Sequence, residues 1–112
     1  MEHAVAALSA LAHEGRLAIF RTLVQAGPEG LAAGEVGRRV GIAPNTLSAS
    51  LAVLAHAGLV QSRRDGRSII YRAAYDRMAD LLGFLVEDCC NGRPEICTPL
   101  AAIANRAACC AA

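Results

Sequence analysis

The stretch "AAGEVGRRVGIAPNTLSASLAVLAHAGLV" (residues 32–60) predicts two helices joined by a tight turn. A short helix is expected at about residues 34–40, followed by a turn at Gly41 and Ile42. A longer helix then begins at Pro44, since proline suits the first helical position. The apolar stripe of this longer helix consists of Leu47, Leu51 and Leu54. The sequence therefore predicts a helix-turn-helix over about residues 34–57.

The period changes to an alternating one in "LVQSRRDGRSIIYR" (residues 59–72). Two β-prone runs flank Asp65 and Gly66, a pair typical of two-residue hairpin turns because both central positions of a type I′ turn need positive φ. We therefore expect a two-stranded hairpin over about residues 59–72, with Asp65 and Gly66 at its tip and arginines on both arms.

Helices are expected on both sides of this central third. Their approximate ranges are residues 4–11, 14–25, 76–88 and 98–108, the second being ended by "GPEG" at residues 27–30. The 112 residues are enough for one domain, 54% of them hydrophobic and only 4% aromatic. We therefore expect a single domain over residues 1–112 that is mainly α with a small β-hairpin.

Charge is unevenly distributed along the chain. The formal net charge is only +1, but residues 38–72 hold six arginines against a single acid, a net charge of +5. Such a basic segment is typical of nucleic-acid binding, although arginines can also do no more than solvate an exposed hairpin.

The first twelve residues, "MEHAVAALSALA", lack a basic leading segment and are too short to span a membrane. The expectation is therefore a cytoplasmic protein with no membrane partner. In a reducing compartment, the five cysteines point to metal binding, redox sensing or burial rather than to structural disulfides.

A helix-turn-helix followed by an arginine-bearing hairpin is the layout of a winged helix-turn-helix. The longer helix would enter the major groove of double-stranded operator DNA, and the hairpin, or wing, would meet phosphates. The groove-facing candidates are Asn45, Thr46, Ser48, Ala49 and Ser50, and the wing candidates are Arg63, Arg64 and Arg67.

The sequence also resembles the ArsR/SmtB family of winged-helix repressors. The resemblance covers nearly all of residues 8–72, and its most specific parts are "L..L..AGLV" and "RR.GR...Y". It implies a homodimer joined through its first and last helices, here including residues 76–88, that leaves operator DNA when a metal or metalloid binds. The chain departs from the family at Ala49 and Ser50, where a basic residue and a histidine are common, and at Ala43, where a serine cap is usual.

The cysteines lie in a C-terminal thiol segment and tail (residues 89–112). Cys89 and Cys90 are adjacent, so their Cα atoms, about 3.8 Å apart, are too close for an ordinary disulfide. "NGRPE" (residues 91–95) would turn the chain and return Cys97 toward them. No cysteine lies on the short helix of the helix-turn-helix, and residues 76–88 contain no histidine, which excludes a thiol site on the former and a histidine zinc site on the latter.

Three thiolates select thiophilic ions such as trivalent arsenic or antimony. Cys89, Cys90 and Cys97 resemble the site of arsenic-responsive members of the family, which makes As(III) the expected inducer ligand. The alternatives left open are a thiol-disulfide redox switch on the same residues, and a contribution from Cys109 and Cys110. An enzyme is not expected, because no nucleotide-binding motif and no paired base and nucleophile can be identified.

Overall fold

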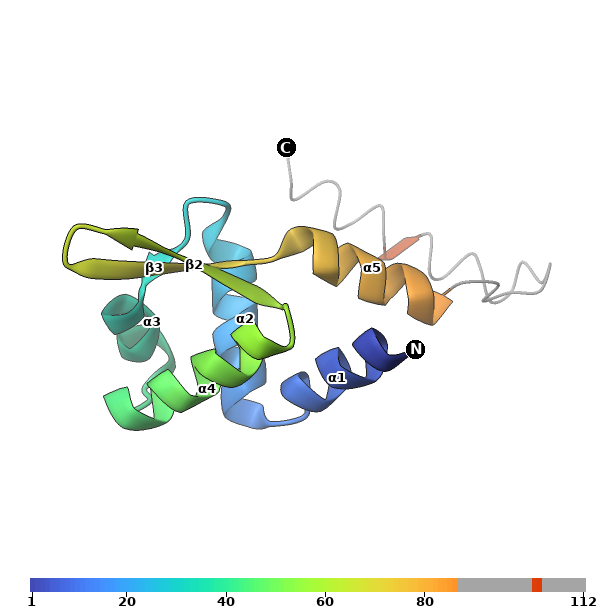
Figure 1. Ribbon diagram of the computed structural model, residues 1–112, viewed down its shortest axis with the longest axis horizontal. Helices are drawn as coiled ribbons and strands as arrows, with labels where there is room; N and C mark the ends of the chain where they lie inside the picture. The colour runs from blue at the N-terminus through green and yellow to red at the C-terminus, as the bar shows by residue number, and fades with distance from the viewer. Residues whose placement is uncertain (87–101, 104–112) are drawn as a thin grey trace. The chain divides into compact units, whose positions relative to one another are not determined.

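The computed structural model describes residues 1–86 and 102–103 (Figure 1). Its elements, in chain order, are α1 (Glu2–Leu11), α2 (Glu14–Ala26), β1 (Leu31–Ala32), α3 (Ala33–Val40), α4 (Pro44–His56), β2 (Val60–Asp65), β3 (Ser68–Ala73) and α5 (Tyr75–Val86). The helix-turn-helix prediction is confirmed, with α3 and α4 as its two helices. The prediction of a mainly α chain with a small β element is confirmed as well.

The chain divides into two compact units, residues 1–81 and 82–112. Only residues 82–86 and 102–103 of the second unit are described, so the expected single domain stays a prediction. Most of the expected helix at residues 98–108 lies outside the described residues, although residues 102–103 are helical. In the described part of the chain, no helix has the length and apolar character needed to cross a membrane.

The core of the first unit forms around α2, which contacts α1, α3, α4 and β3. Figure 1 shows α2 passing behind the sheet and α4. The largest fully buried side chains are Ile19, Leu23, Val36, Leu51, Leu54 and Leu59. Aliphatic side chains thus fix the angle between the two helices of the helix-turn-helix, because α3 and α4 both pack on α2.

The sheet has three antiparallel strands in the order β1-β3-β2, so the expectation of a two-stranded hairpin was incomplete. The additional strand pairs Leu31 with Tyr71 and Ala32 with Ile70. Gly30 precedes it with φ of +74°, and a Cβ there would overlap the carbonyl oxygen of Tyr71. Only glycine fits at this position, so Gly30 is what lets β1 approach β3.

The tip of the wing differs by one residue from the prediction. Asp65 pairs with Ser68 as the last residue of β2, so the two-residue loop consists of Gly66 and Arg67. Gly66 has φ of +63°, which supplies the left-handed backbone conformation at the first loop position. The shift places Arg67, rather than Asp65, at the end of the hairpin.

Side-chain hydrogen bonds fix the junction between α1 and α2. His13 is the N-cap of α2, and its Nδ1 accepts from the backbone N–H of Gly15 at 3.1 Å and of Arg16 at 3.4 Å. The Nε of Arg16 donates to the carbonyl oxygen of Ala10 at 2.6 Å, at the end of α1. These bonds satisfy backbone groups that both helix ends leave open.

Candidate nucleic-acid interface

The amino-terminal half of α4 presents small, uncharged side chains to solvent. Asn45, Thr46, Ser48 and Ala49 are all exposed. The opposite face of the helix is buried, with Leu47, Leu51 and Leu54 each 4% exposed or less. The core thus fixes which side of α4 faces outward, and four of the five candidate residues lie on the outer side.

Ser50 is the fifth candidate, and the structure corrects it. Its exposed fraction is 6%, because it lies three residues after Leu47 and four before Leu54 and so shares their buried face. Ser50 therefore belongs mainly to the packing surface of α4, although it also lines a hollow with Asn45, Thr46 and Ala49.

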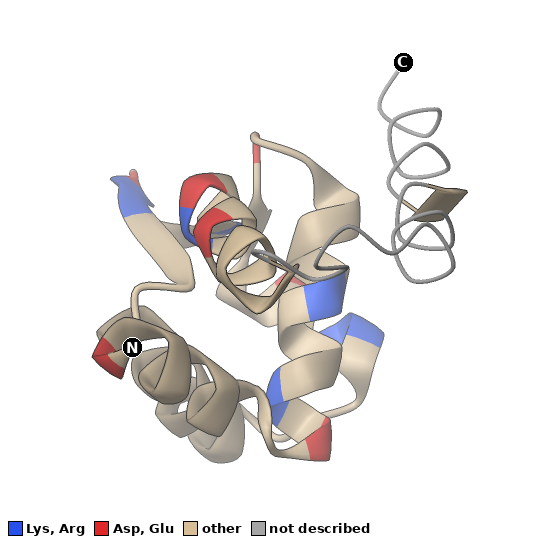
Figure 2. Cartoon of the chain, turned by 90° about the vertical axis from the view of Figure 1, so that its right-hand side faces the viewer, with Lys and Arg blue, Asp and Glu red and all other residues tan. Residues whose placement is uncertain are grey.

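The exposed start of α4 carries no formal charge, and no Lys, Arg, Asp or Glu occurs anywhere in the helix. Figure 2 marks the Lys, Arg, Asp and Glu residues of the described chain. Its N-cap, Ala43, makes no side-chain hydrogen bond to the first turn. Backbone N–H groups in that turn, such as those of Asn45 and Thr46, therefore remain uncapped by a side chain. Uncapped N–H groups at a helix start can bind phosphate oxygens.

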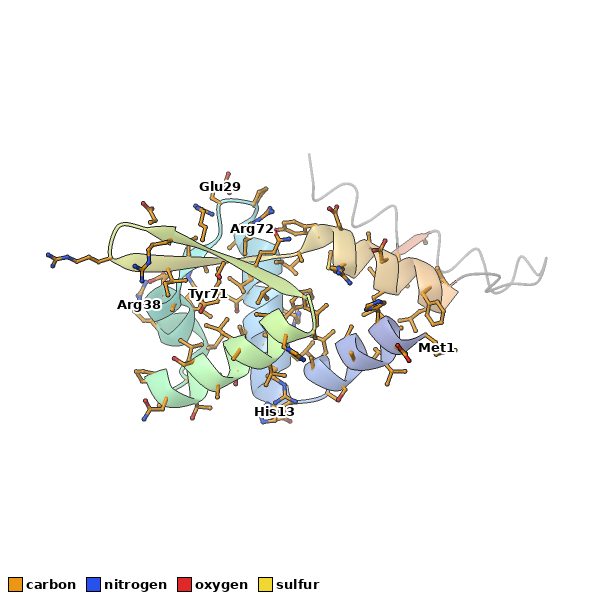
Figure 3. All side chains as sticks on the ribbon, in the orientation of Figure 1. Met1, His13, Glu29, Arg38, Tyr71 and Arg72 are labelled. Atoms are coloured by element: carbon orange, nitrogen blue, oxygen red, sulfur yellow. The ribbon has the colours of Figure 1, made fainter. Side chains whose placement is uncertain are left out.

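Basic side chains flank this start of α4 on two sides. On one side, Arg38 of α3 lines a shallow hollow together with Pro44 and Ser48. On the other, His13 and Arg16 line a second hollow with Asn45, Thr46 and Ala49. Figure 3 shows His13 and Arg38 on different elements, with His13 at the lower end of the unit.

The arginines of the wing are not equivalent, since Arg63, Arg64 and Arg67 are exposed whereas Arg72 is half-buried. Arg63 donates from Nη2 to the carbonyl oxygen of Glu29 at 3.0 Å, which ties β2 to the turn before β1. Arg72 donates from Nη2 to Oε1 of Gln61 on the neighbouring strand at 2.5 Å. Figure 3 places Glu29 and Arg72 on the same side of the sheet. Arg64 and Arg67 make no hydrogen bond or ion pair within the described part of the chain, so their guanidinium groups are open to an external anion.

Two further arginines share one carboxylate on α3. The Nη2 of Arg38 lies 2.6 Å from Oε1 of Glu35, and the Nε of Arg39 lies 2.9 Å from the same oxygen. The hydrogen bond from Arg38 is the main cause that lowers the pKa of the Glu35 carboxyl, and the hydrogen bond from Arg39 lowers it further. The same pairing raises the pKa of Arg38. Sequence reasoning missed this cluster, although a glutamate three and four residues before two arginines is a helical ion-pair signal.

The cysteines of the predicted inducer site all lie outside the described residues: Cys89, Cys90, Cys97, Cys109 and Cys110. Within residues 1–86 and 102–103, no group of three histidine, cysteine, aspartate or glutamate residues is placed to hold a metal ion. The ligand set therefore stays a prediction from sequence.

Known proteins share both the sequence and the fold. A helix-turn-helix domain family matches residues 11–63. A biofilm growth-associated repressor from Agrobacterium fabrum is 40% identical over 75 residues, which make up 67% of this chain and 62% of that protein. The chain thus spans less than two thirds of the length of this curated relative.

Two solved structures add to the comparison. The reduced form of HlyU from Vibrio cholerae shares 32% identity and a TM-score of 0.61, over 75% of this chain and 88% of that one. The homodimeric winged helix-turn-helix DNA-binding domain of Mb0332 from Mycobacterium bovis, a possible ArsR-family transcriptional regulator, shares 30% identity and a TM-score of 0.62, over 78% and 81% of the two chains.

Proposed function

Because this chain belongs to the ArsR family of winged helix-turn-helix transcriptional regulators, we propose that it is a homodimeric repressor that releases operator DNA when its C-terminal cysteines are oxidised. Members of this family are regulators and not enzymes. The observation that carries the DNA-binding part of the proposal is the uncharged, exposed start of α4 together with the unpaired arginines of the wing.

DNA binding would divide between these two surfaces. The exposed side chains of α4 can reach base edges in the major groove, with Asn45 suited to a bidentate contact with adenine. Arg64 and Arg67 can each neutralise a phosphate, because neither guanidinium is bound to another group of the described chain. Recognition of the DNA sequence and binding of the DNA backbone would thus depend on different elements of the protein.

Dimerisation is supported by apolar side chains that the first and last helices leave exposed. On α1, Val5 is 57% exposed and Leu8 43% exposed. On α5, Leu82 and Leu85 are 53% and 50% exposed. Side chains of this kind favour association with a second chain. The similar Mb0332 domain is homodimeric.

Redox control rests on the thiol chemistry of residues 89–97. Cys97 would form a disulfide with Cys89 or Cys90, because the adjacent pair is poorly placed to bond to itself. Two thiols and one hydrogen peroxide give one disulfide and two waters, so peroxide takes up the two electrons. The similarity to a structure of HlyU in its reduced form supports this inducer over a metalloid.

Trivalent arsenic is the second candidate inducer, and the three cysteines within nine residues favour it. Three thiols would displace the three hydroxides of arsenous acid as three waters and form an As(S)₃ pyramid. Antimonite would react in the same way. Nothing is oxidised in this reaction, which separates it experimentally from disulfide formation.

The test begins with selection of operator-like duplexes from a random library by the reduced protein. Affinity for the selected duplex is then measured with hydrogen peroxide, and separately with arsenite under anaerobic conditions with a phosphine reductant. Redox control predicts release by peroxide, reversal by dithiothreitol and a mass loss of two hydrogens per disulfide. Release by arsenite alone, without that mass loss, would establish the second candidate instead.

Matched variants locate the site. Cys97→Ser should abolish release by either inducer, whereas Cys109→Ser with Cys110→Ser should leave it intact. If the reduced wild-type protein selects no duplex, the proposal of a DNA-binding repressor is wrong whatever its cysteines do.

A further inference from the structure

The carboxylate of Glu35 holds two arginines next to the start of α4. Arg38 donates to it from Nε at 2.9 Å and from Nη2 at 2.6 Å, so both donors on one edge of the guanidinium are occupied. Arg39 donates from Nε at 2.9 Å. One anionic group thus binds two cations in the free protein.

The position of Arg38 gives this pairing a consequence for DNA. Arg38 lines the hollow that also contains Pro44 and Ser48, at the exposed start of α4. If α4 enters the major groove of a duplex, the DNA backbone comes close to α3, the first helix of the helix-turn-helix. The guanidinium of Arg38, with a 75% exposed side chain, can therefore meet a phosphate there.

A phosphate and the Glu35 carboxylate bind a guanidinium in the same way, through two parallel N–H···O bonds. Both ligands cannot occupy the same edge of Arg38 at once. The side chain of Glu35 is only 27% exposed, and hydrogen bonds from both arginines favour its charged form. The carboxylate is thus a built-in competitor for the phosphate.

From this arrangement, and resting on the proposed DNA binding, we infer that Glu35 limits DNA affinity by sequestering Arg38 and Arg39 from phosphates. In the free chain, Arg64 and Arg67 can bind a phosphate directly. Arg38 and Arg39 must first exchange the Glu35 carboxylate for a phosphate. Glu35 lowers the affinity for every duplex alike, because phosphate contacts carry no sequence information. A repressor restrained in this way binds non-operator DNA less.

The experiment compares wild type with Glu35→Gln on two probes: the duplex selected by the reduced protein and a mixed-sequence duplex of the same length. We expect Glu35→Gln to bind both probes about three- to tenfold more tightly, and the slope of log K against log[salt] to steepen by about 0.9 for each phosphate gained. Equal gains on both probes are expected because the gained contacts are to phosphates.

Glu14→Gln is the matched control, since Glu14 is also a first-turn glutamate, is exposed and forms no ion pair within residues 1–86. It removes the same charge without releasing an arginine. In the Arg38→Ala, Arg39→Ala background, Glu35→Gln should have no effect beyond that of Glu14→Gln. Circular dichroism on all variants checks that each remains folded.

The outcomes separate the two proposals. If wild type binds DNA but Glu35→Gln behaves like Glu14→Gln, or weakens binding, the inference about Glu35 is wrong and the proposed function stands. If wild type binds neither probe, the proposed function is wrong and the inference falls with it.

Discussion

Helix α4 and the wing present opposite kinds of surface to solvent. The exposed start of α4 carries Asn45, Thr46, Ser48 and Ala49 without a formal charge, over a buried leucine stripe. In the wing, every residue of β2 after Val60 is exposed, and the arginines Arg64 and Arg67 are unpaired within the described residues. Under the proposed function, the wing would supply salt-dependent affinity and the helix would supply sequence preference. The following variants test that division, from the largest expected effect to the smallest.

Removing the unpaired arginines should cost the most. Arg64→Ala with Arg67→Ala removes up to four phosphate contacts per dimer, so we expect about 100-fold weaker binding and a salt slope shallower by about 3.6. Fluorescence anisotropy across a salt series measures both. A loss confined to the selected duplex, with mixed-sequence binding unchanged, would contradict the division.

Displacing the wing without touching its arginines should lower stability as well as DNA binding. Gly30→Ala places a Cβ against the carbonyl oxygen of Tyr71 and requires positive φ of a non-glycine residue, so we expect a loss of about 2 kcal/mol in the free energy of unfolding. Urea unfolding measures it. Gly34→Ala is the control, because its Cβ meets nothing within 4 Å and it lies in α3, so it should be at least as stable as wild type.

Removing one polar side chain from the exposed start of α4 should change the sequence preference of DNA binding and not its salt dependence. Asn45→Ala removes a candidate base contact, so the ratio of affinities for selected and mixed-sequence duplexes should fall about tenfold, while the salt slope stays as in wild type. Competition binding gives the ratio. An unchanged ratio would show that α4 does not read bases through Asn45.

The buried serine should matter less than its exposed neighbour. Ser50→Ala changes a side chain that is 6% exposed, so DNA affinity should stay within about twofold of wild type and stability within about 1 kcal/mol. Ser48→Ala makes the same chemical change on the exposed face and should lower the preference for the selected duplex more. The reverse order would restore Ser50 as a groove-facing residue.

The smallest effect concerns pH. Since the pKa of Glu35 is lowered in the folded chain, its ion pairs stabilise the fold above the ordinary carboxyl pKa, and this contribution is lost as pH falls through the lowered value. The difference in urea midpoint between wild type and Glu35→Gln should therefore shrink on acidification. A difference that grows with falling pH would contradict the assignment.

Sequence predicted the helix-turn-helix well because its signals are local. Pro44 marks the start of α4, and the expected end at Ala57 differs from the observed one by a single residue. Strand β1 was missed because two residues have no periodicity of their own. Leu31 and Ala32 are extended only because they pair with β3, about 40 positions later.

The candidate site was predicted less completely than the fold. Ser50 was misplaced although the sequence carried the signal, since its spacing of three residues from Leu47 and four from Leu54 puts it on the side of the leucine stripe. The wing tip was predicted one residue too early because "DGR" allows two placements of the two-residue loop. The pairing of Asp65 with Ser68 selects the placement at Gly66 and Arg67. His13 was not recognised as a cap, since histidine is outside the residues usually preferred there.

The neutral outer face of α4 has a consequence for how the DNA preference of such a protein can evolve. The four exposed side chains near its start are small, and the buried leucines beneath them stabilise the fold. Substitutions at positions 45, 46, 48 and 49 can therefore alter the preferred operator while the fold, the wing and their general hold on DNA persist. A gene duplicate could acquire a new set of targets in a few such steps, which makes this helix a convenient starting point for engineering repressors with chosen recognition sequences.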